Sequence, residues 1–188
     1  SQRANHGAAF QESVFDEVNA TVQQTPGART FIRTLRRMGM KTAIVSAGFT
    51  RFTDAFAADL GIDYSLANTL EVKDGLITGE IDGPVVDRSR KGEFLRELAA
   101  KEGIGLGQTV AVGDGANDLD MLSTAGLGIA FNAKDLVREN ADTSLSVPYL
   151  DAILFVMGVR REHVEAADAQ DPDLDGQDQI PVPGTPPI

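Results

Sequence analysis

Apolar side chains recur at helical spacing in several stretches of this chain. Between Pro26-Gly27 and Gly39, for example, Phe31, Leu35 and Met38 fall on one face, and a period of three to four residues is typical of an amphipathic helix. Gly39 is expected to end that helix. The same spacing predicts further helices over residues 10–24, 50–60, 91–101, 117–125, 133–140 and 149–157.

Short apolar runs lie between the predicted helices and indicate buried strands. Residues 70–85 differ, because strand-like sequence on both sides of Asp74-Gly75 predicts a hairpin with a tight turn. Strand and helix otherwise alternate, so the fold class is α/β with a mostly parallel sheet. The predicted strands cover residues 41–46, 64–68, 109–113, 127–131 and 144–146.

Composition agrees with a packed domain followed by a different kind of tail. Apolar residues make up 42% of the 188 residues and charged residues 24%, which are ordinary values for a globular domain. After Ala169 the sequence becomes rich in Asp, Gln and Pro. Such a segment buries too little apolar area to offset its ordering entropy, so residues 169–188 are expected to form a disordered tail.

Charge and cysteine content exclude several kinds of partner. The net charge of −11 argues against nucleic acid as a partner, because phosphate backbones are bound by Lys and Arg. The longest apolar stretch, residues 150–159, carries Asp151 and is too short to cross a bilayer. There is no cysteine and no signal-peptide pattern, so we expect a cytoplasmic protein without membrane contact.

The first candidate binding segment lies at the end of the predicted strand that contains Val45. Ser46-Ala47-Gly48 follows it, and small residues before a helix let a phosphate reach backbone N–H groups while Ser46 donates its hydroxyl. The alternative is structural: Ser46 is the N-cap of the helix that follows.

A second strand end carries two carboxylates four positions apart. The run from Gly113 to Asp118, GDGAND, places Asp114 between two glycines and Asp118 in the first helical turn. Mg²⁺ prefers such oxygen ligands, with some of them bound through water. Helix capping by Asn117 and Asp118 is the structural alternative, and it leaves Asp114 unexplained.

Lys91 opens the helix after the hairpin. Its ammonium could hold a phosphoryl group and neutralise charge during phosphoryl transfer. Taken alone, a lysine is more often a solvated surface residue, so Lys91 gains meaning only together with Ser46 and Asp114.

In this combination the sequence resembles the haloacid dehalogenase-like superfamily of phosphohydrolases, in which a hydroxyl-ended strand, a lysine and GDxxND follow in this order. The resemblance implies a Rossmann-like three-layer core. It also implies that Ser46 and the N–H groups of Ala47 and Gly48 bind phosphate, and that Lys91 bridges phosphate and nucleophile. The remaining roles that it implies are direct Mg²⁺ coordination by Asp114, metal contact through water by Asp118, and phosphate contact by Asn117.

Finer segments resemble the phosphoserine phosphatase family within that superfamily, over roughly Thr25 to Ala167. They are TPGA at 25–28, VSAGF at 45–49, ANTLEVKDGLITG at 67–79, GDGANDLDM at 113–121 and AGLGIAFNAK at 125–134. Ala47 is a departure, because the family usually has Gly there. The resemblance implies Mg²⁺-dependent hydrolysis of O-phospho-L-serine, the last step of serine synthesis, through an aspartyl-phosphate.

The family's nucleophile motif, Asp-x-Asp-Ser-Thr, is missing from the sequence. Asp16 is the nearest look-alike, but the required second Asp is Val18 and the segment has helical periodicity. The acidic run 171–176 imitates a calcium loop without its terminal Glu. Because the first strand, the nucleophile, the general acid and most of the cap are missing, we interpret the chain as the C-terminal portion of a longer protein and expect it to be inactive alone.

This interpretation predicts the organisation of the chain. Residues 1–24 are a remnant of a helical cap, residues 25–168 are a core that lacks its central nucleophile strand, and residues 169–188 are the tail. The missing strand would lie between those of Ser46 and Asp114, leaving two unpaired edges and an apolar slot. A homodimer is left open. The alternatives are another phosphatase of the superfamily and a non-catalytic phosphate-binding domain. A P-type ATPase fragment is a third alternative, but it would carry membrane segments and a DKTG motif, and this chain has neither.

Overall fold

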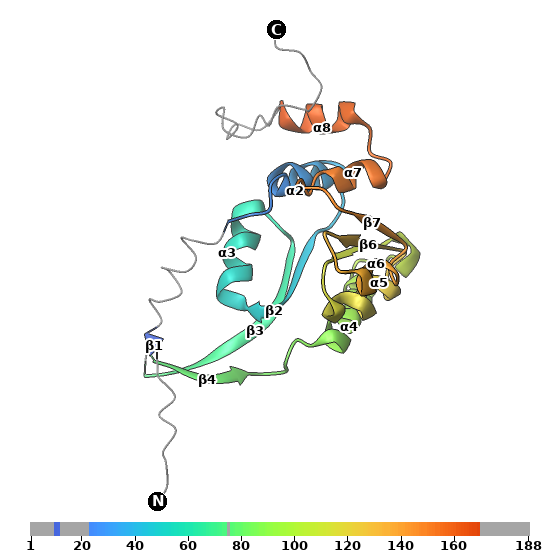
Figure 1. Cartoon of the computed structure of the whole chain (residues 1–188). Helices are drawn as coiled ribbons and strands as arrows, with labels where there is room; N and C mark the ends of the chain where they lie inside the picture. The colour runs from blue at the N-terminus through green and yellow to red at the C-terminus, as the bar shows by residue number, and fades with distance from the viewer. Residues whose placement is uncertain (1–9, 12–22, 75, 170–188) are drawn as a thin grey trace, which may run out of the picture.

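The computed structural model describes residues 10–11, 23–74 and 76–169 of the chain. Over these residues helices alternate with strands, as the sequence predicts (Figure 1). The helices are α2 (Ala28–Arg37), α3 (Thr50–Leu60), α4 (Arg88–Lys101), α5 (Leu119–Thr124), α6 (Asp135–Arg138), α7 (Ala152–Val156) and α8 (Arg161–Asp168), with short 3₁₀ turns η1 (Leu106–Gln108) and η2 (Ala116–Asp118).

The strands form two separate sheets. One has the order β1-β4-β3-β2 and the other the order β5-β6-β7. β2 runs parallel to β3, and β5, β6 and β7 are mutually parallel. The strands are β1 (Phe10–Gln11), β2 (Ala43–Phe49), β3 (Tyr64–Lys73), β4 (Leu76–Asp82), β5 (Val110–Gly113), β6 (Leu127–Phe131) and β7 (Thr143–Leu145). β2 and β5 are therefore edge strands of two sheets.

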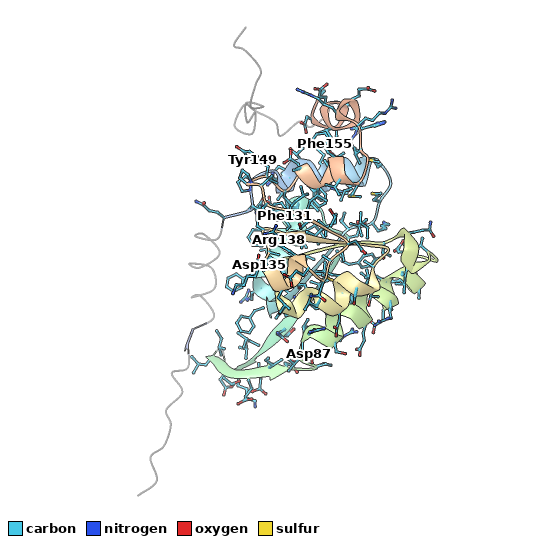
Figure 2. All side chains as sticks on the ribbon, turned by 45° about the vertical axis from the view of Figure 1, so that its right-hand side comes forward. Asp87, Phe131, Asp135, Arg138, Tyr149 and Phe155 are labelled. Atoms are coloured by element: carbon cyan, nitrogen blue, oxygen red, sulfur yellow. The ribbon has the colours of Figure 1, made fainter. Side chains whose placement is uncertain are left out.

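Helices cover both faces of β6, which gives three layers. Ile129 and Phe131 belong to a core with side chains of α2, α7 and α8. Ala130, pointing the other way, belongs to a second core with Met121 and Leu122 of α5 and with Val137 of α6. Figure 2 shows Phe131 in the interior, while Phe155 of α7 lies near the top and is exposed. The three-layer α/β core is confirmed.

The hairpin extends one strand of the parallel sheet. β3 pairs with β2 up to Asn68 and then with β4 from Thr69 onward, and Asp74 has a left-handed φ of 52° at the turn. Asp and Asn tolerate this conformation better than most residues. The predicted hairpin is confirmed, with the added finding that β3 is continuous through both pairings.

The predicted helix over 10–24 is wrong at its start. Phe10 and Gln11 form a short strand that pairs antiparallel with Ile77 and Leu76 of β4. The prediction is also wrong at its end, because Gln23 and Gln24 are not helical. Residues 12–22 lie outside the described residues, as does the predicted tail beyond Ala169. The cap remnant therefore stays a prediction.

Several boundaries also differ. β2 runs to Phe49 rather than ending at Ser46, and α4 begins at Arg88 rather than Lys91 because Asp87 caps it, accepting a hydrogen bond from the Arg90 N–H at 2.9 Å. α6 and α7 are shorter than predicted. Helix α8 was not predicted; it packs against α2 and carries Asp168, which forms an ion pair with Arg33.

Candidate active site

An elongated cavity of ≈ 620 Å³ separates β2 from β5. The two sheets supply side walls through their edge strands, and helices α2 and α4 supply much of the rest. Most lining side chains are apolar, and the polar ones are Lys41, Thr42, Tyr64, Glu102, Gln108 and Thr109. The lining residues include Phe31, Ile32 and Leu35 of α2, Ala43, Ile44 and Val45 of β2, Phe94, Leu95 and Leu98 of α4, and Val110, Ala111 and Val112 of β5.

Two strand edges and two helix faces are the surroundings of an interior strand in a three-layer fold. Strand edges carry N–H and C=O groups that require partners. Within the described part of the chain, β2 pairs only with β3 and β5 only with β6. The position of this cavity between two strand edges is the one expected for the predicted slot, and the missing strand itself stays a prediction.

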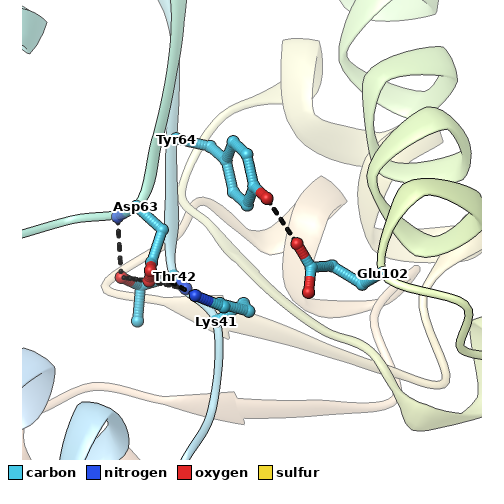
Figure 3. Close-up of polar contacts among 5 residues, drawn as sticks. All are labelled: Lys41, Thr42, Asp63, Tyr64 and Glu102. Carbon is cyan, nitrogen blue, oxygen red and sulfur yellow. Dashed lines mark hydrogen bonds and ion pairs between the residues drawn. The ribbon is translucent and has the colours of Figure 1, made fainter.

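Polar groups lie at the amino ends of β2 and β3 (Figure 3), whereas Ser46, Ala47 and Gly48 lie toward the other end of β2. The Asp63 carboxylate accepts hydrogen bonds from the Thr42 N–H at 2.9 Å, the Thr42 hydroxyl at 3.1 Å and Lys41 Nζ at 2.9 Å. Partial burial raises the pKa of Asp63, but the hydrogen bonds from Lys41 and Thr42 outweigh it and hold that pKa below its ordinary value. Beside them, the hydrogen bond that Tyr64 donates to Glu102 raises the pKa of the Tyr64 phenol.

Ser46, Ala47 and Gly48 lie near the carboxyl end of β2, where its register with β3 shifts between Val45 and Phe49. The Gly48 N–H donates to Ser46 Oγ at 2.9 Å. Phe49, not Ser46, is the N-cap of α3, so the capping alternative for Ser46 is wrong. Ala47 and Gly48 are exposed, and a phosphate can approach their backbone.

Lys91 and Asp118 form a buried ion pair. Lys91 Nζ lies 2.6 Å from Asp118 Oδ1, and the residues are 4% and 6% exposed. The other oxygen, Asp118 Oδ2, accepts the N–H groups of Asp114 at 3.2 Å and Gly115 at 3.1 Å. The solvated-surface alternative for Lys91 is therefore wrong, and Asp118 holds the loop that carries Asp114.

Close packing between α4 and the segment after β5 makes this pair feasible. A Cβ on Gly92 would lie 3.3 Å from the carbonyl of Asp120, and one on Gly113 would lie 2.5 Å from Asp118 Cβ. Glycine at both positions lets the two backbones approach, which brings Lys91 to Asp118. Arg88 adds a hydrogen bond to Asp120 at 2.6 Å across the same contact.

Asp114 and Asn117 are exposed at the tip of this loop. Among the described residues none donates a hydrogen bond to the Asp114 carboxylate, which leaves its oxygens available to a cation. The Asn117 side chain folds over Gly115, where a Cβ would collide with Asn117 Oδ1.

The donor set fits a magnesium site in part. Asp114 offers a free carboxylate of the kind that Mg²⁺ prefers. Both oxygens of Asp118 are engaged, so it suits contact through water rather than direct coordination. In the described ranges no three His, Cys, Asp or Glu side chains gather closely enough to hold a metal.

The structure places the predicted residues at the carboxyl ends of β2 and β5, two edge strands of separate sheets. Val45, next to Ser46, packs against the core that contains Ala111 of β5, so β2 and β5 face a common core. Sequence reasoning missed Asn68, whose buried side chain bonds the carbonyl of Ala47. Its signal was only an Asn within a predicted strand, where Asn is uncommon.

The family model of haloacid dehalogenase-like hydrolases matches residues 3–123. The chain belongs to the haloacid dehalogenase-like hydrolase family. That family match runs through β5 and the loop of Asp114 and Asp118, and so includes all the candidate site residues.

Relatives with high identity have one name in common. The chain is 56% identical over 167 residues to a phosphoserine phosphatase of Streptomyces coelicolor, covering 89% of this chain and 41% of the relative. It is 53% identical over 164 residues to a phosphoserine phosphatase of Mycobacterium tuberculosis, covering 87% and 40%. The chain thus spans about two fifths of the length of these haloacid dehalogenase-like relatives.

Solved structures of the same family share the fold. A substrate-bound phosphoserine phosphatase complex is 40% identical with a TM-score of 0.76, covering 79% of this chain and 70% of that one. A probable phosphoserine phosphatase from Vibrio cholerae is 35% identical with a TM-score of 0.76, covering 86% and 49%. Over the described residues, no helix is long and apolar enough to span a membrane.

Proposed function

We propose that this chain forms the phosphate- and metal-binding part of a cytoplasmic, Mg²⁺-dependent phosphoserine phosphatase. The observation that carries the proposal is the buried Lys91–Asp118 pair, which holds the backbone of Asp114 and Gly115 at the carboxyl end of β5. The names of the relatives support phosphoserine as the substrate.

Each residue has a distinct task in this proposal. The Ser46 hydroxyl and the N–H groups of Ala47 and Gly48 bind phosphoryl oxygens, and the Gly48 N–H exchanges its bond to Ser46 Oγ for one to phosphate. Lys91 has three N–H donors, of which Asp118 takes one, and the others offset negative charge on the phosphoryl group. Asn117 contacts phosphate from the loop that follows the carboxyl end of β5.

Asp114 would bind Mg²⁺ directly and Asp118 would reach it through water. A bound Mg²⁺ supplies Lewis-acid polarisation of a phosphoryl oxygen. The Lys91 ammonium keeps Asp118 in place from the buried side, so the Asp114 loop is rigid before substrate arrives.

The nucleophile comes, in this proposal, from an Asp-x-Asp-Ser-Thr strand that is not among these residues and that fills the groove between β2 and β5. Its first Asp attacks phosphorus and displaces the serine oxygen, which takes a proton from the second Asp. Water then hydrolyses the aspartyl-phosphate to free phosphate. The cavity between two strand edges supports this placement.

The test is to complete the chain. A segment that carries the Asp-x-Asp-Ser-Thr strand is fused ahead of Ser1 or added in trans, and phosphate release from O-phospho-L-serine, glycerol phosphate and glucose phosphate is measured with Mg²⁺. We expect turnover of phosphoserine at about 1–10³ s⁻¹, none from the 188 residues alone, and none when the first Asp of the segment is Asn. Equal turnover by the chain alone contradicts the proposed source of the nucleophile. A completed protein that prefers another ester contradicts the substrate.

A further inference from the structure

Asn68 lies where β3 leaves one partner for another. Its Cα is paired with Phe49 of β2, and the next residue, Thr69, pairs with Asp82 of β4. The residue is 4% exposed. A polar side chain buried to this degree requires hydrogen-bond partners.

Both ends of the Asn68 amide are engaged. Nδ2 donates to the carbonyl oxygen of Ala47 at 2.7 Å, and Oδ1 accepts from the N–H of Val86 at 2.7 Å. One partner is an acceptor and the other a donor, so only one orientation of the amide satisfies both. Val86 is 2% exposed, which shields this bond from water.

The hydrogen bond from Asn68 Nδ2 to the Ala47 carbonyl orients the Ala47–Gly48 peptide of the candidate phosphate site. The register between β2 and β3 shifts between Val45 and Phe49, and within this stretch the Asn68 side chain supplies a hydrogen bond to the Ala47 carbonyl. In a trans peptide the C=O and the following N–H point in opposite directions. Holding the Ala47 carbonyl therefore directs the Gly48 N–H away from Asn68, to Ser46 Oγ at 2.9 Å.

The second bond fixes the approach to Lys91. Val86 precedes Asp87, the N-cap of α4, whose carbonyl accepts the Lys91 N–H at 3.2 Å. The Asn68 side chain thus joins the Ser46–Gly48 segment to the first turn of α4.

We infer that Asn68 is a positioning residue that sets the Ser46–Gly48 peptide and Lys91 in the mutual arrangement that binds a phosphoryl group. The inference rests on the proposed function for its catalytic consequence. The arrangement of the peptide itself is independent of it.

The test uses two variants. Asn68→Asp keeps an acceptor for Val86 but loses the donor to Ala47, and Asn68→Leu removes both bonds without adding charge. In the completed protein each is expected to lower kcat/KM for phosphoserine and weaken inhibition by inorganic phosphate, by about 10- to 100-fold. This is less than the roughly 10²- to 10³-fold for removal of an aligned N–H donor, because the donors are displaced and not removed. Asn140→Asp removes a bond of the same length at an exposed position, Nδ2 to the Leu136 carbonyl at 2.7 Å, on the loop after α6. It should change neither.

A double-mutant cycle separates positioning from general stability. If Asn68 acts through the Ser46–Gly48 peptide, Asn68→Leu should reduce kcat/KM much less in a Ser46→Ala background than in the wild type. Full additivity of the two losses, or a loss within twofold of the Asn140→Asp variant, overturns the inference.

A measurement that does not depend on catalysis tests the positioning role independently of the proposed function. In the 188-residue chain, deuterium exchange at the Gly48 amide should be about tenfold faster in Asn68→Leu than in wild type or Asn140→Asp. An unchanged Gly48 amide overturns the positioning role even if the completed protein is a phosphatase. A changed one supports the role even if phosphoserine is not hydrolysed.

Discussion

Lys91 Nζ donates to Asp118 Oδ1 at 2.6 Å across 27 positions of sequence, inside the contact between α4 and the turn that precedes α5. Removing one partner of a buried pair leaves the other charge uncompensated. Lys91→Met is therefore expected to lower the free energy of unfolding of the chain by about 3–5 kcal/mol, measured by urea denaturation. The double variant Lys91→Met/Asp118→Asn should lose less than the sum of the single variants. Additive losses would show that the two side chains do not interact.

Asp114 is expected to matter for metal and not for stability. It is exposed, and none of the described residues donates to its carboxylate. Asp114→Asn should keep the free energy of unfolding within about 0.5 kcal/mol of wild type while Mg²⁺ binding by the completed protein, followed by titration calorimetry, is lost. Asp135→Asn, at an exposed carboxylate of α6, is the control and should change neither. Normal Mg²⁺ affinity in Asp114→Asn would refute the assignment.

Position 113 requires glycine because the Asp118 side chain lies too close for any larger residue. A Cβ there would lie 2.5 Å from Asp118 Cβ and 2.7 Å from its Oδ2, so Gly113→Ala must displace the carboxylate from Lys91. We expect a loss of about 1–3 kcal/mol in unfolding free energy and a fall in activity of the completed protein. Gly107→Ala, where a Cβ would meet nothing within 4 Å, should behave as wild type. Equal stability of the two variants would mean that the Asp118 backbone moves freely.

Asp63, at the amino end of the cavity between β2 and β5, is expected to make a pH-dependent contribution to the free energy of unfolding. Its pKa in the folded chain lies below the ordinary 3.8, since the hydrogen bonds from Lys41 and Thr42 outweigh its partial burial. Its stabilisation is therefore complete above pH 3.8 and is lost as the pH falls through the lower folded value. Asp63→Ala should cost about 1–3 kcal/mol at pH 7, and the difference from wild type in urea midpoint should shrink below pH 3.8. A constant difference down to pH 2 would contradict this.

Much of the fold follows from local pattern. Helix α3 ends at Leu60 because Gly61 adopts a left-handed φ of 68° there. A glycine at this position predicts a helix end from the sequence alone. β6 matches its predicted bounds, since its apolar run is bounded by Gly126 and Asn132. The start of α4 could have been found as well, because Asp87 is an ordinary N-cap residue.

Other features depend on contacts that no local pattern encodes. The pairing of Phe10 with Ile77 joins segments far apart in sequence, and two residues are too few for a periodic signal. The burial of Lys91 depends on Asp118, 27 positions away. The role of Asn68 depends on Ala47 and Val86 together, so it emerges only when three segments are placed in space.

The most direct measurement of the central claim follows deuterium exchange at the backbone amides of β2 and β5. The 188-residue chain is compared with the same chain completed by the Asp-x-Asp-Ser-Thr segment. If that strand fills the groove, amides of both edge strands should exchange at least about tenfold more slowly in the completed protein, while β7, at the far edge of its sheet, stays unchanged. Unchanged exchange in β2 and β5, with phosphatase activity present, would show that the nucleophile reaches the site by another route.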